Sequence, residues 1–386
     1  MISSLSHVNA WTVAVPFLEE WMSSPEFGSH SSGKVRTLLE VCSHDGFSGW
    51  AENSGNQIAA IAETIPRLAQ LNRDNQCWTH LNFWHPEELY WSRPAAPSQF
   101  SPDPADIRHR LRHPLQGLWE YALTDLRARR MGVGVSEFFG GRWRDEVPTD
   151  YWAGRVSPER AAQCALRAQQ LGLKGIKLKT TLEDPNIERL EAIREAVTAD
   201  FHVTVDPNGR FYRFDDAWPV IREMDRIGNL RVLEDPFPRF HLADFALLRP
   251  KIDARLAVHL DPEESFSSVL ASGAAGALNI DSHRIGPFQW RILAGAAEQA
   301  NLLIWHGGGG DLGIGTAWHL QLAACAPNCR LPGDQSGPWL RKDTLINERF
   351  TVKAGAVVVP NGPGIGVTIN QDALDCYCQQ KKTWKL

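Results

Sequence analysis

Three acidic residues stand at matching places in the second half of the chain, each at the end of a short apolar run. Asp206 ends HVTVD, Glu234 follows LRVL, and Asp261 follows LAVHL, at intervals of 28 and 27 residues. If these runs are neighbouring strands, their carboxylates meet at one edge and repel each other unless a cation binds. Ligands that are all oxygen suit a hard ion such as Mg²⁺. Each acid could instead cap the helix after its strand, but three matching positions favour a metal site.

The third ligand is less firmly identified than the first two. The run HLDPEES also contains His259, Glu263 and Glu264, each close enough to Asp261 to take its place. The sequence therefore prefers Asp261 among four candidates for this ligand.

Two lysines on one strand are candidates for proton transfer. Lys177 and Lys179 in GIKLK share a face, because side chains alternate along a strand. A lysine beside a divalent metal can have its pKa lowered and act as a base. Two solvated lysines at a rim would give the same pattern.

A histidine and an aspartate end two further apolar runs. His306 ends LLIWH, and Asp281 ends ALNID, 25 residues earlier. An Asp on the preceding strand can hold an imidazole in the tautomer that accepts a proton, as in the serine-protease triad. Taken alone, His306 would suit a hydrogen-bonded position in the core as well as a catalytic one. The presence of Asp281 at the equivalent depth favours the catalytic role. The Gly-rich run 306–315 lacks the ending of a phosphate-binding P-loop, so it indicates a loop that gives a substrate room.

These residues need a scaffold that brings strand ends together. From about residue 148, short apolar strands alternate with helices at a period of roughly 25–30 residues, which indicates βαβ units and a parallel sheet. So many units favour a (β/α) barrel; a doubly wound open sheet is the alternative, weakened because no GxGxxG follows the first strand. The sequence predicts an α+β capping domain over 1–147, the barrel over 148–345, and a C-terminal segment, 346–386, that returns to the cap.

Within these domains the pattern places several elements. Apolar spacing predicts helices over 56–71 and 116–131. A hairpin is expected over 34–52, around a turn at His44-Asp45-Gly46, and β structure is expected again over 350–369.

Composition excludes several other classes of protein. The 386 residues are 43% hydrophobic and 22% charged, with a formal net charge of −5 and no Lys/Arg-rich run, so neither a nucleic-acid nor a membrane partner is expected. The seven cysteines form no paired zinc motif, and the N-terminus does not resemble a signal peptide. We expect reduced thiols in a cytoplasmic protein.

In this order the motifs resemble the enolase superfamily, in its mandelate racemase/muconate lactonizing enzyme-like group and the mandelate racemase branch. The matching motifs are KLK at 177–179, DPN at 206–208, EDP at 234–236, and the pair Asp281 and His306. The resemblance extends to 117–141, 35–52 and 359–367, nearly the whole chain. Three departures are Gly286-Pro287 for the usual Gly-Gly, Asp261 where Glu is more common, and Asp334 at a loosely aligned acidic position in the eighth strand.

The resemblance implies a capped barrel of modified TIM type that removes the α-proton of a small carboxylate substrate. Mg²⁺ held by Asp206, Glu234 and Asp261 would stabilise the resulting enediolate, and pairing such an ion with a Lys or His base is a known property of the superfamily. Lys179 would transfer the proton and Lys177 would hold the substrate carboxylate.

In the same reading His306, tuned by Asp281, would work from the opposite face of the substrate. Two groups on opposite faces permit either racemisation or dehydration, and because the His–Asp branch of the family is dominated by sugar-acid dehydratases, the resemblance favours dehydration of a sugar acid to a 2-keto-3-deoxy acid. Racemisation, epimerisation or cycloisomerisation is the alternative. Against it, the lysine-only subgroup, whose acid/base groups are all lysines, normally has Lys in place of Asp281. A carboxylate-binding barrel without turnover is the non-enzymatic alternative. Relatives are usually symmetric oligomers, so a homo-oligomer is expected.

Substrate specificity is expected to depend mainly on the capping domain. Loop 15–34 could close over the mouth, and its aromatic residues Phe17, Trp21 and Phe27 either line the site or pack the cap. The remaining candidates for substrate contact are Asn208, Asp334, Tyr151 and Trp152.

Overall fold

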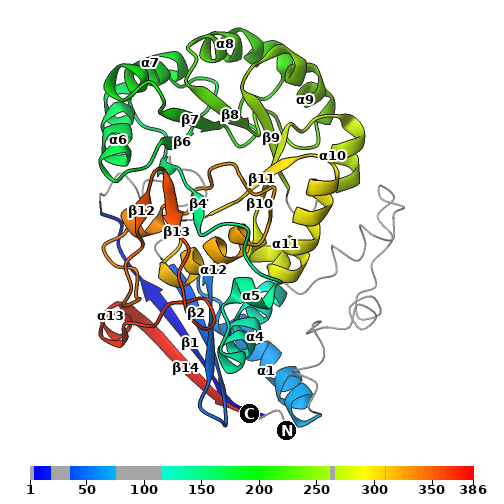
Figure 1. The fold of residues 1–386 in the computed structure, drawn as a ribbon, viewed down its shortest axis with the longest axis vertical. Helices are drawn as coiled ribbons and strands as arrows, with labels where there is room; N and C mark the ends of the chain where they lie inside the picture. Colours follow the sequence, from blue (N-terminus) through cyan, green and yellow to red (C-terminus); the bar gives the residue numbers. More distant parts are fainter. Residues whose placement is uncertain (1–3, 19–34, 75–114, 261–265, 309) are drawn as a thin grey trace.

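The computed structural model describes residues 4–18, 35–74, 115–260, 266–308 and 310–386. Its strands form a seven-stranded parallel sheet, a four-stranded antiparallel sheet and a small three-stranded sheet. Figure 1 shows the parallel sheet in the upper half of the molecule with helices around its outer side, and the antiparallel sheet below it.

The parallel sheet confirms the predicted succession of strands. Its order is β11-β10-β9-β8-β7-β6-β5, so each strand pairs with its neighbour in the chain. The strands are β5 (Tyr151–Ala153), β6 (Gly175–Lys179), β7 (His202–Asp206), β8 (Leu230–Glu234), β9 (Arg255–Leu260), β10 (Ala277–Ile280) and β11 (Leu303–His306). Because the strands are parallel, their carboxyl ends meet at one rim, which we call the mouth.

Helices alternate with these strands, as predicted. They are α6 (Pro158–Gln170), α7 (Asn186–Ala196), α8 (Phe214–Arg226), α9 (Leu242–Leu248), α10 (Phe266–Ser272), α11 (Ser282–Gln299) and α12 (Gly313–Ala324). Helix α6 shows how the sequence specifies them: Ser157 accepts a hydrogen bond from the backbone N–H of Arg160, and Pro158 occupies the first turn. Its small apolar residues at three- and four-residue spacing are buried.

The expected barrel is not closed by regular strand pairing in the described residues. Where an eighth strand is expected, the segment 328–333 makes only isolated parallel bridges, from Cys329 to Ile304 of β11 and from Gly333 to Thr149 before β5. Pro327 and Pro332 provide the physical reason, since proline has no N–H to donate to a ladder.

The antiparallel sheet joins the two ends of the chain. Its order is β14-β1-β2-β3, from β1 (Leu5–Ala14), β2 (Val35–Ser43), β3 (Ser48–Ser54) and β14 (Cys378–Lys385). The predicted hairpin is confirmed as β2 and β3, with Gly46 at φ 86° in its turn. This sheet packs with α1 (Ile58–Arg73) and α4 (Gln116–Met131), and we call these six elements the cap.

The predicted β structure over 350–369 does not join the cap sheet. It forms β12 (Val352–Lys353), which pairs with β13 (Ala356–Val358), and β13 pairs in turn with β4 (Glu146–Pro148) just before the parallel sheet. The chain returns to the cap later, through α13 (Gln371–Tyr377) and then β14. The short helix α5 (Val135–Phe138) follows α4.

Small residues allow α4 to contact both the cap sheet and α11 closely. A Cβ on Gly49 of β3 would collide with the backbone of Ala122 and Leu126 in α4. A Cβ on Gly117 of α4 would lie 2.8 Å from the carbonyl oxygen of His283 in α11. Glycine at these places therefore lets α4 join the cap to the parallel sheet's helix layer.

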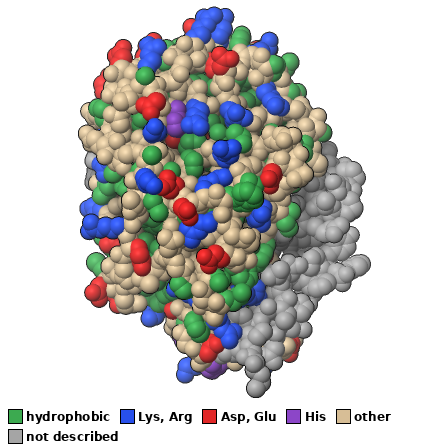
Figure 2. Space-filling model, viewed as in Figure 1, with side chains coloured by type: hydrophobic (Ala, Val, Ile, Leu, Met, Phe, Trp, Pro, Cys, Tyr) green, Lys and Arg blue, Asp and Glu red, His purple; other side chains and the backbone are tan. Residues whose placement is uncertain are grey.

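The surface has mixed charge on the side drawn in Figure 2. Lys and Arg side chains are interspersed there with Asp and Glu, and neither sign dominates. Within the described residues, no helix has both the length and the apolar character needed to cross a membrane.

Candidate active site

Strand register places the predicted basic and acidic residues on one face of the parallel sheet. Lys179 is in register with Asp206, and Lys177 with Thr204. Thr204 is in register with Val232, two residues before Glu234. Since neighbouring parallel residues in register point the same way, Lys177, Lys179, Asp206 and Glu234 share the inner face near the mouth.

Lys177 is the centre of this cluster. Its Nζ lies 2.7 Å from Glu234 Oε2, 3.2 Å from Asp206 Oδ2 and 3.3 Å from Asp334 Oδ2. All four side chains are buried. The structure thus brings together four residues that the sequence predicts, including the loosely aligned Asp334.

Lys179 contacts the same site from its outer edge. Its Nζ contacts Asp206 Oδ2 and donates to Asn208 Oδ1 at 2.8 Å. The backbone N–H of Asn208 donates to Asp206 Oδ1 at 3.0 Å, with Asn208 in the left-handed region at φ 49°, which Asn tolerates better than most residues. Asn208, a predicted candidate for substrate contact, therefore lies beside Lys179.

The charges of the cluster shift one another's titration. Burial disfavours the ammonium of Lys177, but Asp334, Glu234 and Asp206 raise its pKa well above its usual value. Burial also opposes ionisation of Asp206, yet Lys179 and Lys177 hold its pKa below the usual range. Burial and the neighbouring Asp206 raise the pKa of Glu234. Lys177 is therefore a fixed cation. Of Asp206 and Glu234, Glu234 is the carboxyl whose negative charge is less compensated by the nearby lysines.

Two predicted metal ligands, Asp206 and Glu234, lie in this cluster, and their donor set suits a hard cation. Asn279 adds a side chain beside them: its Nδ2 donates to Glu234 Oε1 at 2.7 Å, while its buried Oδ1 has no hydrogen-bond partner among the described residues. Carboxylate and amide oxygens are what Mg²⁺ prefers. The residues present therefore fit such an ion. Asp261, Glu263 and Glu264 lie outside the described residues.

His259 is the one alternative third ligand that the structure describes. Its Nδ1 lies 3.7 Å from Glu234 Oε1, and atoms of Glu234, Asp235 and His259 could together hold an ion. Asp235 is already engaged, since it accepts from the His259 backbone at 2.9 Å and from Arg239 Nε at 2.8 Å. Burial raises its pKa to about 7, against the effect of Arg239.

His306 does not reach this cluster. Trp305 is in register with Asn279 on the inner face, so the next residue, His306, points to the helix layer. It is 1% exposed and its ring stacks on His319 with centroids 4.1 Å apart. Its Nε2 contacts Ser282 Oγ, its Nδ1 lies 2.5 Å from the carbonyl oxygen of Gly307, and burial lowers its pKa to about 4.

The predicted contact between Asp281 and His306 is also corrected. Asp281 Oδ1 lies 2.6 Å from His283 Nδ1 and accepts a hydrogen bond from the His283 backbone at 2.9 Å. Asp281 is the N-cap of α11, a role for which Asp is well suited. His283, two residues further along the chain, thus takes the place expected for His306.

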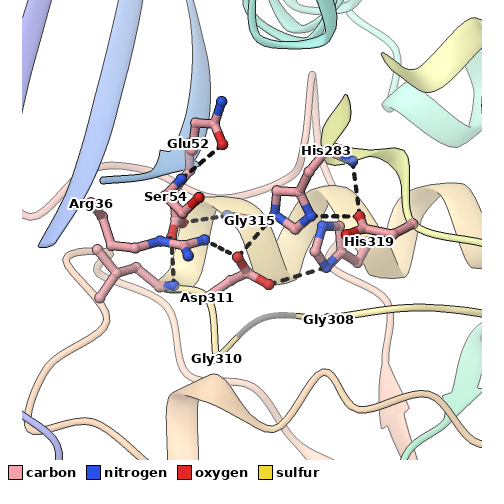
Figure 3. A network of polar contacts seen from close by, with 12 residues as sticks. Arg36, Glu52, Ser54, His283, Gly308, Gly310, Asp311, Gly315 and His319 are labelled. Carbon is pink, nitrogen blue, oxygen red and sulfur yellow. Dashed lines mark hydrogen bonds and ion pairs between the residues drawn. The ribbon is translucent and has the colours of Figure 1, made fainter. Parts of the chain in front are cut away.

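A buried polar network behind the mouth was not predicted. Figure 3 shows Arg36 of the cap in contact with both Glu52 and Asp311, and Asp311 also lies close to His283 and His319. His283, Asp311 and His319 together could hold an ion, but the Arg36 guanidinium already supplies positive charge to Asp311. Charged residues inside the apolar strands β2 and β3 were the available signal for this network.

The aromatic candidates are placed differently. Trp152 is in register with Lys177 and shares its face, whereas Tyr151, its neighbour in β5, points to the opposite face and is fully buried. Phe17 packs under the guanidinium of Arg341, 4.4 Å from ring centroid to Cζ. Trp21 and Phe27 lie outside the described residues.

Residues 159–373 match the family described as Enolase C-terminal domain-like. The chain is 29% identical over 270 residues to an o-succinylbenzoate synthase of Enterococcus faecalis (strain ATCC 700802 / V583), across 68% of this chain and 71% of the relative. It is 28% identical over 275 residues to muconate cycloisomerase 1 of Rhodococcus opacus, across 69% and 70%. It is 26% identical over 280 residues to a D-gluconate dehydratase of Thermoproteus tenax, across 67% and 55%.

Among solved structures, a muconate lactonizing enzyme from Klebsiella pneumoniae superposes with a TM-score of 0.74 at 19% identity. The match covers 98% of this chain and 100% of that one. A likeness at this identity concerns the fold.

Proposed function

Because the chain belongs to the enolase superfamily, we propose that it is an enzyme that uses Mg²⁺ to remove the α-proton of a small carboxylate substrate. One observation carries the proposal: Lys177 and Lys179 lie against Asp206 and Glu234 on one face of the sheet at the mouth. This is a proton-transfer group beside a donor set for a hard cation.

The two lysines have different roles in this proposal. Lys177 is enclosed by three carboxylates and stays charged, so it holds negative charge on the substrate and does not accept the proton. Lys179 lies nearer the solvent, with 13% of its side chain exposed against 4% for Lys177. The Nζ of Lys179, in its neutral form, accepts the α-proton.

Asp206 and Glu234 would hold the cation, with Asp261 as the proposed third ligand. When bound, the ion would stabilise the negative charge that develops on the substrate carboxylate as the proton leaves. Trp152 is in register with Lys177, and the centroid of the Trp305 ring lies 6.0 Å from Lys177 Nζ. Both side chains are nearly fully buried, so they help to exclude water beside Lys177.

We further propose a sugar acid as the substrate and dehydration as the outcome. The bond from C2 to hydrogen breaks toward Lys179, the C3–O bond breaks with loss of water, and the enol product becomes a 2-keto-3-deoxy acid. The presence of Asp281 where the lysine-only subgroup has Lys, and a D-gluconate dehydratase among the relatives, support this outcome. The resemblance assigns the proton for the departing hydroxyl to His306, whose ring would have to leave the helix layer to deliver it.

Cycloisomerisation or a related one-base reaction is the second candidate. The position of His306 favours it, because Lys179 is then the sole proton-transfer group of the described cluster. An o-succinylbenzoate synthase and a muconate cycloisomerase among the relatives also favour it.

Deuterium exchange tests the proposal without knowledge of the true substrate. A panel of sugar acids, N-acyl amino acids and unsaturated diacids is incubated with the protein and Mg²⁺ in deuterated water, and deuterium at the α-carbon is measured. We expect exchange with at least one acid, its loss in Lys179→Ala, and no change in the control Lys174→Ala, whose lysine lies before β6 and pairs with Asp200 at 3.1 Å. Exchange that survives in Lys179→Ala would contradict the proposal, and the product formed decides between the two candidate reactions.

A further inference from the structure

Two charged side chains of the cap are buried against the parallel-sheet region. Arg36 in β2 donates from Nε to Glu52 Oε1 at 2.8 Å and contacts Asp311 Oδ1 through Nη2. Glu52 in β3 accepts the backbone N–H groups of Leu312 at 2.8 Å and Gly315 at 2.7 Å, at the start of α12. A carboxylate is stabilised at a helix N-terminus, where N–H groups lack helical partners. The pair therefore docks the cap on the segment that carries Asp311.

Asp311 connects this pair to His283 (Figure 3). His283 Nε2 lies 3.0 Å from Asp311 Oδ1, and Nδ1 lies 2.6 Å from Asp281 Oδ1. A neutral imidazole has one donor nitrogen and one acceptor nitrogen, whereas an ionised carboxylate only accepts. Both contacts are therefore satisfied only when both ring nitrogens carry a proton, so His283 is an imidazolium held between two carboxylates.

The surroundings of His283 support its positive charge. Burial disfavours it, but Asp281 and Asp311 raise the pKa of His283 well above the ordinary value. The ionisable groups that face this region come from every packed element: Asp281 after β10, His306 of β11, Asp311, His319 of α12, Arg36 and Glu52 of the cap sheet, Glu120 and Tyr121 of α4, and Arg341.

The chain of contacts from Arg36 through Asp311 and His283 ends at Asp281, and Asp281 is its member at the mouth. Its side chain is 32% exposed, against 2% for Asp311. It lies two residues after Asn279, whose amide contacts the predicted metal ligand Glu234. A residue two places along a strand points to the same side, so Asp281 borders the site in which Lys179 is proposed to act.

We infer that His283 is a positioning residue: clamped between Asp281 and Asp311, it fixes the Asp281 carboxylate at the mouth and ties it, through Asp311, to Arg36 of the cap. The inference rests on the proposed function, because it concerns the geometry in which the α-proton is removed. The cap thus acts on the reaction through a chain of charges as well as through any contact with the substrate.

The kinetic test compares His283→Gln with His202→Gln. His202 is a matched control: it also pairs with a buried carboxylate, with Nε2 2.8 Å from Asp150 Oδ1, but at the first residue of β7, away from the mouth. We expect His283→Gln to lower kcat for α-proton exchange by about 10- to 100-fold with KM little changed, because small misplacements in a site slow the reaction by such factors. His202→Gln should exchange at the wild-type rate.

Arg36→Met should also lower kcat for α-proton exchange, as His283→Gln does. Since both residues act through one chain of contacts, the double variant should be no slower than the slower single variant. Wild-type kcat in His283→Gln, or losses that multiply in the double variant, would overturn the inference.

Ring ¹⁵N NMR of the full chain separates this inference from the proposed function. His283 is expected to keep both nitrogens protonated at about pH 8, where an ordinary histidine is neutral. Asp311→Asn should shift it toward the neutral form and leave His7 of β1 unchanged. A neutral His283 in the wild type overturns the inference, whatever the exchange assay shows. A charged His283 in a protein that exchanges no acid leaves the clamp in place and contradicts the proposed function instead.

Discussion

At the scale of single residues, Lys177 carries the most stringent test of the cluster. Its ammonium compensates Asp206, Glu234 and Asp334, all buried with it. Lys177→Met should lower the free energy of unfolding in urea by about 3–5 kcal/mol, because it leaves buried carboxylates without their partner. Lys174→Met, which removes an exposed ion pair, should leave stability unchanged within error. Equal effects of the two changes would show that the buried cluster does not form.

His306 gives a prediction in pH. Burial lowers its pKa from 6.5 to about 4, so the folded protein keeps the ring neutral while the unfolded chain takes up a proton below about pH 6.5. The stability due to this neutral ring is complete above pH 6.5 and is lost as pH falls toward 4. When the pH falls from 7 to 4.5, the free energy of unfolding of His306→Gln should therefore decrease by about 1–3 kcal/mol less than that of the wild type. Parallel curves for the two proteins would mean that the ring is accessible to protons in the folded state.

Residue types and spacing predicted much of the cluster. Lys177, Lys179, Asp206 and Glu234 meet because they share one face of neighbouring strands, at or near the strand ends, and the alternation of side chains along a strand makes this predictable from the sequence. The partner of Asp281 was not readable, because a shift of one residue at the end of a four-residue strand turns His306 to the other face. Arg36 and Asp311 are 275 residues apart, so their contact depends on how the cap docks.

At the scale of elements, the kink in α11 is the feature most open to test. Gly286 has φ 77° inside the helix and is followed by Pro287. Gly286→Ala should lower stability by more than about 1 kcal/mol, since the left-handed region penalises a Cβ and that Cβ would collide with Glu120. In the same helix, a Cβ at Gly295 would meet only Arg291 Nη1, at 3.9 Å, so Gly295→Ala should raise stability by up to about 1 kcal/mol. Urea unfolding of both variants gives the comparison, and the same sign for both would contradict it.

The elements themselves were largely predictable, and the exceptions have physical causes. The bounds of α4 were predicted correctly from periodicity, because its apolar residues recur at helical spacing and a glycine C-cap marks its end. Apolar spacing alone predicts a helix only over 288–300, after Gly286-Pro287, which matches the stretch of α11 that follows its kink but not the turn from Ser282 that precedes it. The family resemblance also implied an eighth strand, where Pro327 and Pro332 allow only isolated bridges.

At the scale of the whole molecule, Glu52 is expected to hold cap and parallel-sheet region together. It is buried, pairs with Arg36 and accepts two backbone N–H groups of the α12 start. Glu52→Gln removes the charge and should lower unfolding free energy by about 3–5 kcal/mol, as for other broken buried pairs. Glu40→Gln is the control in the same hairpin: Glu40 accepts a part-buried hydrogen bond from Asn9 at 2.9 Å. Thermal unfolding should separate the two variants clearly; a similar melting temperature would show that Glu52 does not join the two regions.

The central claim is that one cation is held between Asp206 and Glu234, beside the two lysines of β6. Crystals grown with Mn²⁺ and measured for its anomalous scattering test this most directly. The account predicts one strong peak bounded by the carboxylates of Asp206 and Glu234, and its loss in Asp206→Asn. A peak among His283, Asp311 and His319 instead, or none at saturating Mn²⁺, would contradict it.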